Sequence, residues 1–352
     1  MSLVKRQRVD QQSLTEHHRN ALYDAAIVLE GHEGPVLGVR FNSTGDLIAS
    51  GGTDGKVLLW DLPTKQLYDD NQKMLRSDTT VRVNDLEGVL NANYGVIEGH
   101  KSAVTSLRWS DDSSTIVTSS ADTTVGIWDT ETGKRVRKCS LHTLCVNEVD
   151  INDNSTIVSC GDDGLINVWD QRQKLPTHVI TTDFPITSIL FDFHGKRLFA
   201  SGIDPTVLAY DIRDLTKPVF SVGTLRNEST TTSLARNQDD SVIVVRDMTG
   251  LIRTINGREY VPLNVSRQDG QTFEGALSGK EQLLIRVSMN KAGTAICTGS
   301  EDNTIITWDY ATERVTGKYA GHRSTVIDTD YHPHDNMLIS SSSDGTLIIR
   351  EL

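Results

Sequence analysis

The sequence predicts an all-β protein built from repeated, small antiparallel sheets. Six segments share one ending, in which an aspartate stands six positions before a mostly aromatic slot that is followed by an acidic residue. The residues between these segments alternate between apolar and polar, as in GPVLGVRFN and SAVTSLRWS, and turn sequences such as SDDSS separate them. A period of two is typical of half-buried strands. Because helix signals are almost absent, strands account for the predicted fold class.

The chain begins with a segment that the repeat does not cover. Residues 1–24 contain Lys5, Arg6 and Arg8 in VKRQRVD, followed by polar residues. No apolar stretch follows the basic residues, so the segment lacks the pattern of a secretory signal. We expect a flexible tail, which is either a weak nuclear-import or RNA-contact element or a plain solvated end.

Copies of the repeat follow one another along residues 25–352. The aspartates and slot residues are Asp54 and Trp60, Asp122 and Trp128, Asp163 and Trp169, Asp204 and Tyr210, Asp302 and Trp308, and Asp344 and Arg350. A histidine stands 28 or 27 residues before the slot in four copies, at His32, His100, His142 and His322. A degenerate seventh copy ends at Asn256. Asp-Gly at 54–55, 163–164 and 344–345 signals a tight hairpin, so each copy is predicted to be a small antiparallel sheet.

One connection is much longer than the others. Trp60 and His100 are 40 residues apart, whereas Trp128 and His142 are 14 apart, so about 26 residues are inserted within 62–95. Loops of this length are usually functional or disordered. We expect a partner-binding arm that orders on contact, with Tyr68, Met74 and Tyr94 as candidate contact residues.

The last copy has three predicted strands before Leu352. The stretch AAIVL at 25–29 has no sheet of its own. A three-stranded sheet would leave an open edge, which invites aggregation. We therefore expect residues 25–29 to supply the outer strand of the last sheet and to close the chain into a ring.

A repeat of about 40–45 residues with a Gly-His opening and a Trp-Asp ending resembles the WD40 family. The resemblance covers about residues 25–352 and implies a seven-bladed β-propeller of four-stranded blades. It also implies buried hydrogen-bonded sets of a histidine, the hairpin aspartate, a strand serine or threonine and the tryptophan, since stranding a buried polar group costs about 1–3 kcal/mol. The residues expected in these sets are His32, Ser50, Asp54, Trp60, His100, Thr118, Asp122, Trp128, His142, Ser159, Asp163, Trp169, Asp302, Trp308, His322 and Asp344.

The sequence contains no positive sign of an enzyme. Serine, histidine and aspartate are also triad residues, but here the set recurs in several copies, whereas an enzyme needs one site. There is no G-x-S-x-G motif, Gly-rich phosphate loop or H-E-x-x-H motif. Cys139, His142 and Cys145 have the spacing of metal ligands, but His142 fills the histidine slot of its blade and no fourth ligand is evident. We expect no catalysis, no metal and no cofactor.

Charge and composition limit the partners. Lysine and arginine number 35 and aspartate and glutamate 47, which leaves a net charge of −12 and disfavours general binding to phosphate backbones. Four cysteines do not make a disulfide scaffold, so a reducing compartment is expected. No apolar run approaches the roughly 18 residues of a membrane helix. We therefore expect no membrane partner and only minor or indirect contact with RNA.

Two groups of surface residues are candidates for protein contacts. The loops after each Gly-His and the tight hairpins are expected to share one face, which carries Glu33, Lys101, Phe184 and Arg323. Aromatic residues and arginine are favoured interface anchors, so Phe184 and Arg323 are the better candidates. Separately, Trp169-Asp170-Gln171-Arg172 and its echo ending at Arg213 resemble the W-D-x-R corners of substrate receptors for cullin-type ubiquitin ligases. They also fit the plain end of a blade with an arginine after it.

Stretches outside the generic repeat resemble the WD-repeat proteins of the U5 small nuclear ribonucleoprotein. They are VKRQR, GIDPTVLAYDIRDL and KEQLLIRVS, in that order along the chain. The resemblance implies a nuclear, non-catalytic scaffold of the spliceosome in pre-mRNA splicing. It implies a monomer that docks on the large U5 scaffold protein and neighbouring spliceosomal proteins. Two alternatives stay open, a substrate receptor of a cullin-type ubiquitin ligase and a reader of peptides or histone tails.

Overall fold

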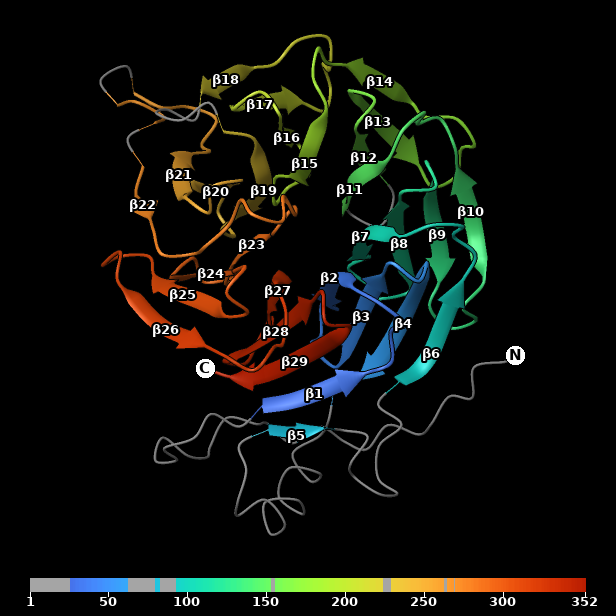
Figure 1. The fold of residues 1–352 in the computed structure, drawn as a ribbon. Helices are drawn as coiled ribbons and strands as arrows, with labels where there is room; N and C mark the ends of the chain where they lie inside the picture. Colours follow the sequence, from blue (N-terminus) through green and yellow to red (C-terminus); the bar gives the residue numbers. More distant parts are fainter. Residues whose placement is uncertain are drawn as a thin grey trace.

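Strands account for all the regular structure in the described part of the chain. A computed structural model describes residues 26–62, 80–82, 93–152, 156–223, 229–262, 265–268 and 270–352. These residues form 29 strands and no helix, so none of them lies in a helix that could span a membrane. The strands make seven sheets that stand around a common centre (Figure 1). The predicted seven-bladed β-propeller is therefore confirmed.

Apart from one parallel edge strand in blade seven, each blade is an antiparallel sheet, and its first strand lies nearest the centre of the ring (Figure 1). Blade one contains β2 (Val36–Phe41), β3 (Leu47–Gly52), β4 (Lys56–Asp61) and β6 (Asn93–Glu98). Blade two contains β7 (Val104–Trp109), β8 (Thr115–Ser120), β9 (Val125–Asp129) and β10 (Arg135–Cys139). Blade three contains β11 (Val146–Asn152), β12 (Thr156–Gly161), β13 (Leu165–Asp170) and β14 (His178–Thr181).

The remaining blades follow in chain order. Blade four contains β15 (Ile186–Phe191), β16 (Arg197–Gly202), β17 (Thr206–Asp211) and β18 (Phe220–Gly223). Blade five contains β19 (Thr231–Arg236), β20 (Val242–Asp247), β21 (Ile252–Asn256) and β22 (Thr272–Phe273). Blade six contains β23 (Val287–Met289), β24 (Ala295–Gly299), β25 (Ile305–Asp309) and β26 (Val315–Tyr319). Blade seven contains β27 (Val326–Tyr331), β28 (Met337–Ser342) and β29 (Thr346–Glu351), joined by β1 (Ala26–Glu30) and β5 (Thr80–Arg82).

The start of the described chain closes the ring. Strand β1 pairs antiparallel with β29, with Ala26 opposite Arg350 and Glu30 opposite Thr346. Figure 1 shows the blue strand β1 lying along the red strand β29. Leu29 is buried in the core between blades one and seven, so the closure is also held by apolar packing. The expected fourth strand of the last blade is confirmed.

Two parts of the predicted insert belong to blades. Strand β5 runs parallel to β1, with Ala26 opposite Thr80, and adds a fifth strand to blade seven. The insert assigned to 62–95 also overlaps β6, which pairs with β4 from residue 93 onwards because that strand needs an outer partner. Tyr94 lies in β6, whereas Tyr68, Met74 and the tail 1–24 lie outside the described residues.

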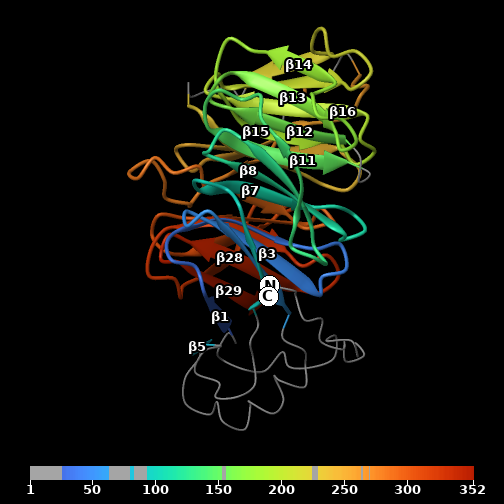
Figure 2. The same cartoon turned by 90° about the vertical axis from the view of Figure 1, so that its right-hand side faces the viewer.

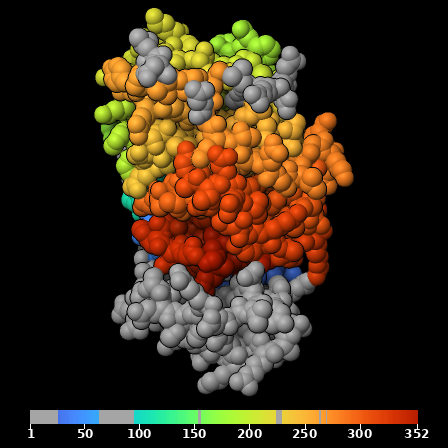
Figure 3. Space-filling model, turned by 90° about the vertical axis from the view of Figure 1, so that its left-hand side faces the viewer, coloured from blue at the N-terminus to red at the C-terminus, as the bar shows by residue number. Residues whose placement is uncertain are grey.

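Apolar side chains fill the space between neighbouring blades. Leu59 and Ile97 of blade one pack with Leu107 and Trp128 of blade two, and equivalent clusters join the other pairs. The middle strands are therefore buried on both faces, as the burial of nearly every residue of β3 and β28 shows. Seen from the side, the sheets stack around the ring, and the atoms of blade six lie directly against those of blade seven (Figures 2 and 3). Packing on two faces makes the ring a rigid support for its loops.

Candidate functional site

Three blades contain a complete chain of hydrogen bonds. In blade one, His32 Nδ1 lies 2.9 Å from Asp54 Oδ2 and His32 Nε2 lies 2.8 Å from Ser50 Oγ. The indole N–H of Trp60 donates to the same Ser50 Oγ at 2.9 Å. A carboxylate only accepts, so His32 Nδ1 carries the proton and Ser50 donates to Nε2. The same bonds join His100, Thr118, Asp122 and Trp128 in blade two, and His142, Ser159, Asp163 and Trp169 in blade three.

The charge states of these residues suit a structural role. Burial lowers the pKa of His32, His100 and His142, although the aspartates oppose this effect. Burial alone would raise the pKa of Asp122, but hydrogen bonds from Thr124, the Lys101 N–H and His100 outweigh it and lower the pKa to about 2. The hydroxyl-bearing residues Ser50, Thr118 and Ser159 are fully buried. Because solvent does not reach these hydroxyls, they cannot meet a substrate as a triad serine would.

The hydrogen-bonded sets hold the loops of one face in place. The hairpin aspartate accepts the N–H of the residue after the histidine, at 2.9 Å between Asp122 and Lys101 and at 2.7 Å between Asp344 and Arg323. Each hairpin also lies against the next blade, because a side chain at Gly55 would meet the carbonyl oxygens of His100 and Ser102. The histidine loops and hairpins thus form one continuous edge, which we call the rim.

Blades six and seven contain altered sets. In blade seven, His322 Nε2 lies 2.8 Å from Ser340 Oγ and Nδ1 lies 3.4 Å from Asp344 Oδ2. Arg350 occupies the tryptophan slot there and donates to the carbonyl of Ala320.

In blade six, the structure brings no histidine to Asp302 and Trp308, because the sequence has none between 194 and 322. Lys318 Nζ of β26 instead contacts Asp302 Oδ2 at 2.6 Å. Trp308 donates to the carbonyl of Glu274 at 3.3 Å. The two residues therefore belong to separate contacts and not to a histidine set.

The candidate contact residues of the rim are exposed but not all adjacent. Arg323, Glu33 and Lys101 directly follow the histidines of blades seven, one and two, which are consecutive in the ring. Phe184, 51% exposed, belongs to blade four, two residues after the position equivalent to a histidine. Blade three lies between blades two and four along the ring, and its rim loop carries the exposed Leu144. The rim therefore offers a charged area and an apolar area.

The two corner arginines lie away from the rim. Arg172 and Arg213 follow the ends of β13 and β17, whereas the rim hairpins precede these strands. Arg213 forms a two-pronged ion pair with Asp211, with Nε at 3.0 Å from Oδ1 and Nη2 at 2.6 Å from Oδ2. The Arg172 backbone N–H donates to Asp170 at 2.8 Å. The local aspartates therefore order these corners as turns.

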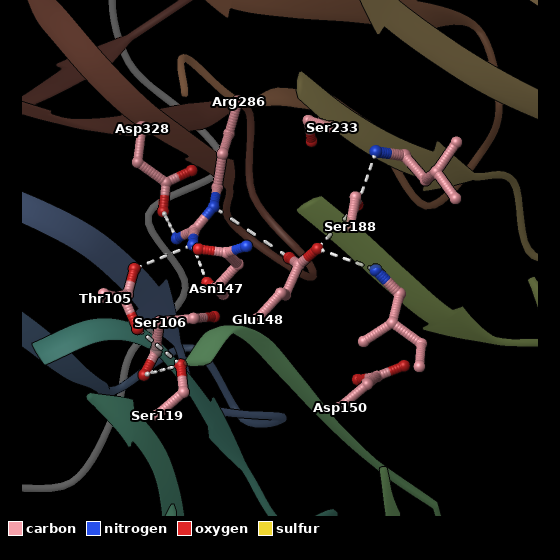
Figure 4. Close-up of polar contacts among 12 residues, drawn as sticks. Thr105, Ser106, Ser119, Asn147, Glu148, Asp150, Ser188, Ser233, Arg286 and Asp328 are labelled. Carbon is pink, nitrogen blue, oxygen red and sulfur yellow. Dashed lines mark hydrogen bonds and ion pairs between the residues drawn. The ribbon is translucent and has the colours of Figure 1, made fainter. Parts of the chain in front are cut away.

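A buried arginine joins the inner strands at the centre of the ring (Figure 4). Arg286, just before β23, is 7% exposed. Its Nη1 lies 3.3 Å from Asp328 Oδ2 on β27, and its Nη2 donates to the carbonyl of Thr105 on β7 at 2.8 Å. Its Nε lies 3.9 Å from Glu148 Oε1 on β11, and Asp328 also receives Arg40 Nη1 at 2.6 Å. One guanidinium thus connects blade six with blades two, three and seven.

Carboxylates of this central network tie two of the inner strands, β27 and β11, to the next inner strand, β2 and β15. Asp328 accepts the N–H of Val39 at 3.0 Å, and Glu148 accepts that of Ile189 at 3.1 Å. Two residues further along the same strands, Asp330 accepts the N–H of Phe41 and Asp150 accepts the N–H of Phe191. Burial raises the pKa of Asp330 to about 6 although Arg40 opposes it, whereas Arg40 and Arg286 outweigh burial and lower the pKa of Asp328. The network therefore favours the ionised carboxylate at Asp328 more strongly than at Asp330.

Sequence reasoning did not find this central network. Its signal is a charged residue at an inner-strand position, as in GVRF, SLRW and NEVD. A strand covered on both faces would otherwise carry apolar or small residues there. The pairing depends on the order of blades around the ring, which the sequence of one strand does not contain.

The spacing of Cys139, His142 and Cys145 does not produce a metal site. Both ring nitrogens of His142 are engaged, Nδ1 by Asp163 and Nε2 by Ser159. Burial raises the pKa of the Cys139 and Cys145 thiols to about 11, which disfavours the thiolate that a metal needs. Across the described ranges, no group of three or more metal-ligating side chains gathers.

Known proteins resemble this chain along nearly its whole length. Residues 25–61, 92–129, 133–170 and 313–350 match the family described as WD domain, G-beta repeat. The chain is 30% identical to the pre-mRNA-splicing factor cwf17 of Schizosaccharomyces pombe, over 99% of this chain and 96% of that protein. It is 29% identical to the U5 small nuclear ribonucleoprotein 40 kDa protein of Dictyostelium discoideum, over 92% of this chain and 83% of the relative. The Homo sapiens protein of the same name is 27% identical, over 95% and 85%. The chain therefore belongs to the WD40-repeat family.

Proposed function

We propose that this chain is a non-catalytic interaction scaffold of the U5 small nuclear ribonucleoprotein, acting in pre-mRNA splicing in the nucleus. The observation that carries the proposal is the extent of the similarity, which covers 99% of the chain against cwf17 and 92% against the 40 kDa protein of Dictyostelium discoideum. A match limited to the repeats would support only the propeller.

The geometry supports a role as a platform for other proteins. The rim loops are held by hydrogen bonds to buried residues, so a partner meets a preformed surface and little ordering entropy is lost on binding. The net charge of −12 favours protein partners over a phosphate backbone. We propose that the chain docks as a monomer on the large U5 scaffold protein and neighbouring spliceosomal proteins, with minor or indirect RNA contact.

Purification of the tagged chain from nuclear extract tests this proposal. The sample is split, one half is treated with RNase, and both halves are analysed for associated proteins and for U5 RNA. We expect U5 scaffold proteins in both halves, because protein contacts hold the complex together. Recovery of no splicing factor, or of a cullin adaptor instead, would overturn the assignment.

Paired variants identify the docking face in the same purification. Phe184→Asp with Arg323→Glu changes the exposed rim, and we expect it to reduce recovery of U5 proteins at least several-fold. Arg172→Ala with Arg213→Ala changes the opposite corners and is the matched control. If the native chain binds a cullin adaptor and Arg172→Ala with Arg213→Ala abolishes that binding, the result would support the alternative, a ubiquitin-ligase substrate receptor.

A further inference from the structure

Blade four lacks three side chains that fill the equivalent space in blades one to three. Leu198 pairs with Tyr210 as Ile48 pairs with Trp60, so Tyr210 occupies the tryptophan slot. Two positions further along the strand, Ala200 stands where blade one has Ser50.

The histidine slot of blade four holds a threonine. A side chain at Gly164 would meet the carbonyl of Thr182, as one at Gly55 would meet the carbonyl of His100. Thr182 is therefore the equivalent of His100, and only the hairpin aspartate, Asp204, is retained in this blade.

The smaller side chains leave a pocket of about 270 Å³, which we call the blade-four pocket. Its lining includes Thr182, Asp183, Phe184, Asp204, Leu208 and Tyr210. The two aspartates and Phe184 are exposed at the pocket, whereas Tyr210 is only 5% exposed. The pocket thus has an acidic and aromatic opening.

The polar groups of the pocket lack protein partners. In blades one to three, the hairpin aspartate accepts a hydrogen bond from a histidine and from the following backbone N–H. The carboxylates of Asp183 and Asp204 form no hydrogen bond or ion pair with any residue that the structure describes. The Tyr210 hydroxyl likewise has no hydrogen-bond partner among those residues, and the burial of this side chain raises its pKa. These groups are arranged to receive donors from outside the chain.

Two other blades show which group replaces a missing member of the set. In blade six, which has no histidine, the Lys318 ammonium contacts the hairpin aspartate Asp302 at 2.6 Å. In blade seven, which has no tryptophan, the buried Arg350 guanidinium fills the slot and lies over the Tyr319 ring at 5.8 Å. A basic side chain therefore fits beside the hairpin aspartate and in the tryptophan slot of this fold. The blade-four pocket has no lysine or arginine in its lining.

We propose that the blade-four pocket binds an arginine or lysine side chain presented by a partner protein. The cation supplies N–H donors to Asp204 and Asp183, and its alkyl stem packs against Leu208 and Phe184. Charge complementarity with two unpaired carboxylates favours a basic side chain over a neutral one of the same shape. The proposal rests on the geometry of blade four and does not depend on the assignment to splicing.

Titration of the isolated full chain with single amino-acid derivatives tests the proposal. The probes are N-acetyl-arginine methylamide, its lysine counterpart, and the citrulline counterpart as a neutral control of similar shape. We expect saturable NMR shifts of Phe184 and Tyr210 with the arginine or lysine probe and at least ten-fold weaker binding of citrulline. Equal binding of the citrulline probe, or no saturable shift with either cation, would overturn the proposal.

Two variants locate the binding. Asp204→Asn should weaken binding of the basic probes at least ten-fold without loss of folding, because its carboxylate holds no protein group. Glu313→Gln, an exposed carboxylate outside the pocket, should leave binding unchanged.

The triple variant Thr182→His, Ala200→Ser and Tyr210→Trp rebuilds the set found in blade one. We expect it to fill the blade-four pocket, abolish probe binding and raise the melting temperature. Unchanged binding in Asp204→Asn, or in a folded triple variant, would contradict the assignment. The isolated chain is used, so the result is independent of whether spliceosomal proteins are recovered in the purification.

Discussion

Equivalent hairpin aspartates have different partners in different blades. Asp122 accepts hydrogen bonds from His100, the Lys101 N–H and Thr124, and Asp302 pairs with Lys318. Asp204 has no such partner among the described residues. The contribution of this residue to stability therefore depends on its surroundings and not on its place in the repeat.

Removal of a fully bonded hairpin aspartate should destabilise the ring. We expect Asp122→Ala to lower the free energy of unfolding by about 2–3 kcal/mol, because it strands the buried His100 and releases the Lys101 loop. Chemical denaturation followed by circular dichroism measures the change. Asp204→Ala is the matched control, with an expected change within about 0.5 kcal/mol. An unchanged unfolding curve for Asp122→Ala would contradict the structural role.

Asp330 should make stability depend on pH with a defined sign. Its folded-state pKa is raised from 3.8 to about 6 by burial. The stability gained because folding favours the protonated form of Asp330 is therefore fully present below pH 3.8 and is lost as the pH rises through about 6. Asp330→Asn keeps an oxygen for the Phe41 N–H and stays neutral. We expect the variant to be more stable than the native chain by about 1–2 kcal/mol at about pH 8, since Asp330 keeps some contact with solvent.

Unfolding by urea at two pH values checks this expectation. At about pH 4, the native chain and Asp330→Asn should have nearly equal stability, because both side chains are then largely neutral. A variant that is less stable than the native chain at about pH 8 would show that Arg40 and Arg108 hold Asp330 ionised.

At the scale of elements, the hairpins between the second and third strands of blades one, two, three, six and seven place one residue in the left-handed region. Gly55, Gly164 and Gly345 supply it, with φ of 74°, 70° and 84°. In blades two and six the same position holds Thr123 and Asn303, with φ of 69° and 66°. A β-branched residue is strained there, whereas glycine and asparagine adopt this region more readily.

Replacement of the strained threonine should stabilise the hairpin of blade two. We expect Thr123→Asn to raise the free energy of unfolding by about 0.5–1 kcal/mol, because asparagine tolerates the left-handed region better. Thermal unfolding measures the shift. The reverse change, Asn303→Thr in blade six, should lower stability by a similar amount. If both changes shifted stability in the same direction, strain would not be the cause.

At the scale of the whole molecule, the ring is joined both at its seam and at its centre. The β1–β29 pairing closes the seam, and the Arg286 network ties inner strands that are far apart in the sequence. A partner that binds the rim therefore meets loops carried by a single cooperative unit.

Loss of the central guanidinium should weaken the whole ring. We expect Arg286→Met to cost about 3–5 kcal/mol, because it leaves part of the charge of Asp328 and Glu148 buried without a partner. Arg314→Met, at an exposed arginine, is the control and should change stability by less than about 0.5 kcal/mol. Urea unfolding of both variants tests the prediction. If Arg286→Met with Asp328→Asn is more stable than Arg286→Met alone, the cost arises from the unpaired carboxylate.

Sequence reasoning reached the architecture but only part of the site. The repeat and its Asp-Gly turns predicted the blades, and the unpaired stretch 25–29 predicted the closing strand. The expected histidine sets of blades one to three correspond to hydrogen bonds in the structure, whereas Asp302 pairs with a lysine from the outer strand. That lysine lies 16 residues away along the chain and carries no motif, so only strand register brings it to the aspartate.

The sequence by itself determined the number of blades, most of the hairpin turns and the histidine sets of blades one to three, because each of these depends on local spacing that repeats along the chain. Tertiary structure alone decided the central network and the blade-four pocket. The network forms because seven inner strands converge on one axis, which brings together charges from distant blades. The pocket is lined by Thr182 and Tyr210, which are smaller than the histidine and tryptophan they replace, and by residues of other segments that meet only in the folded blade.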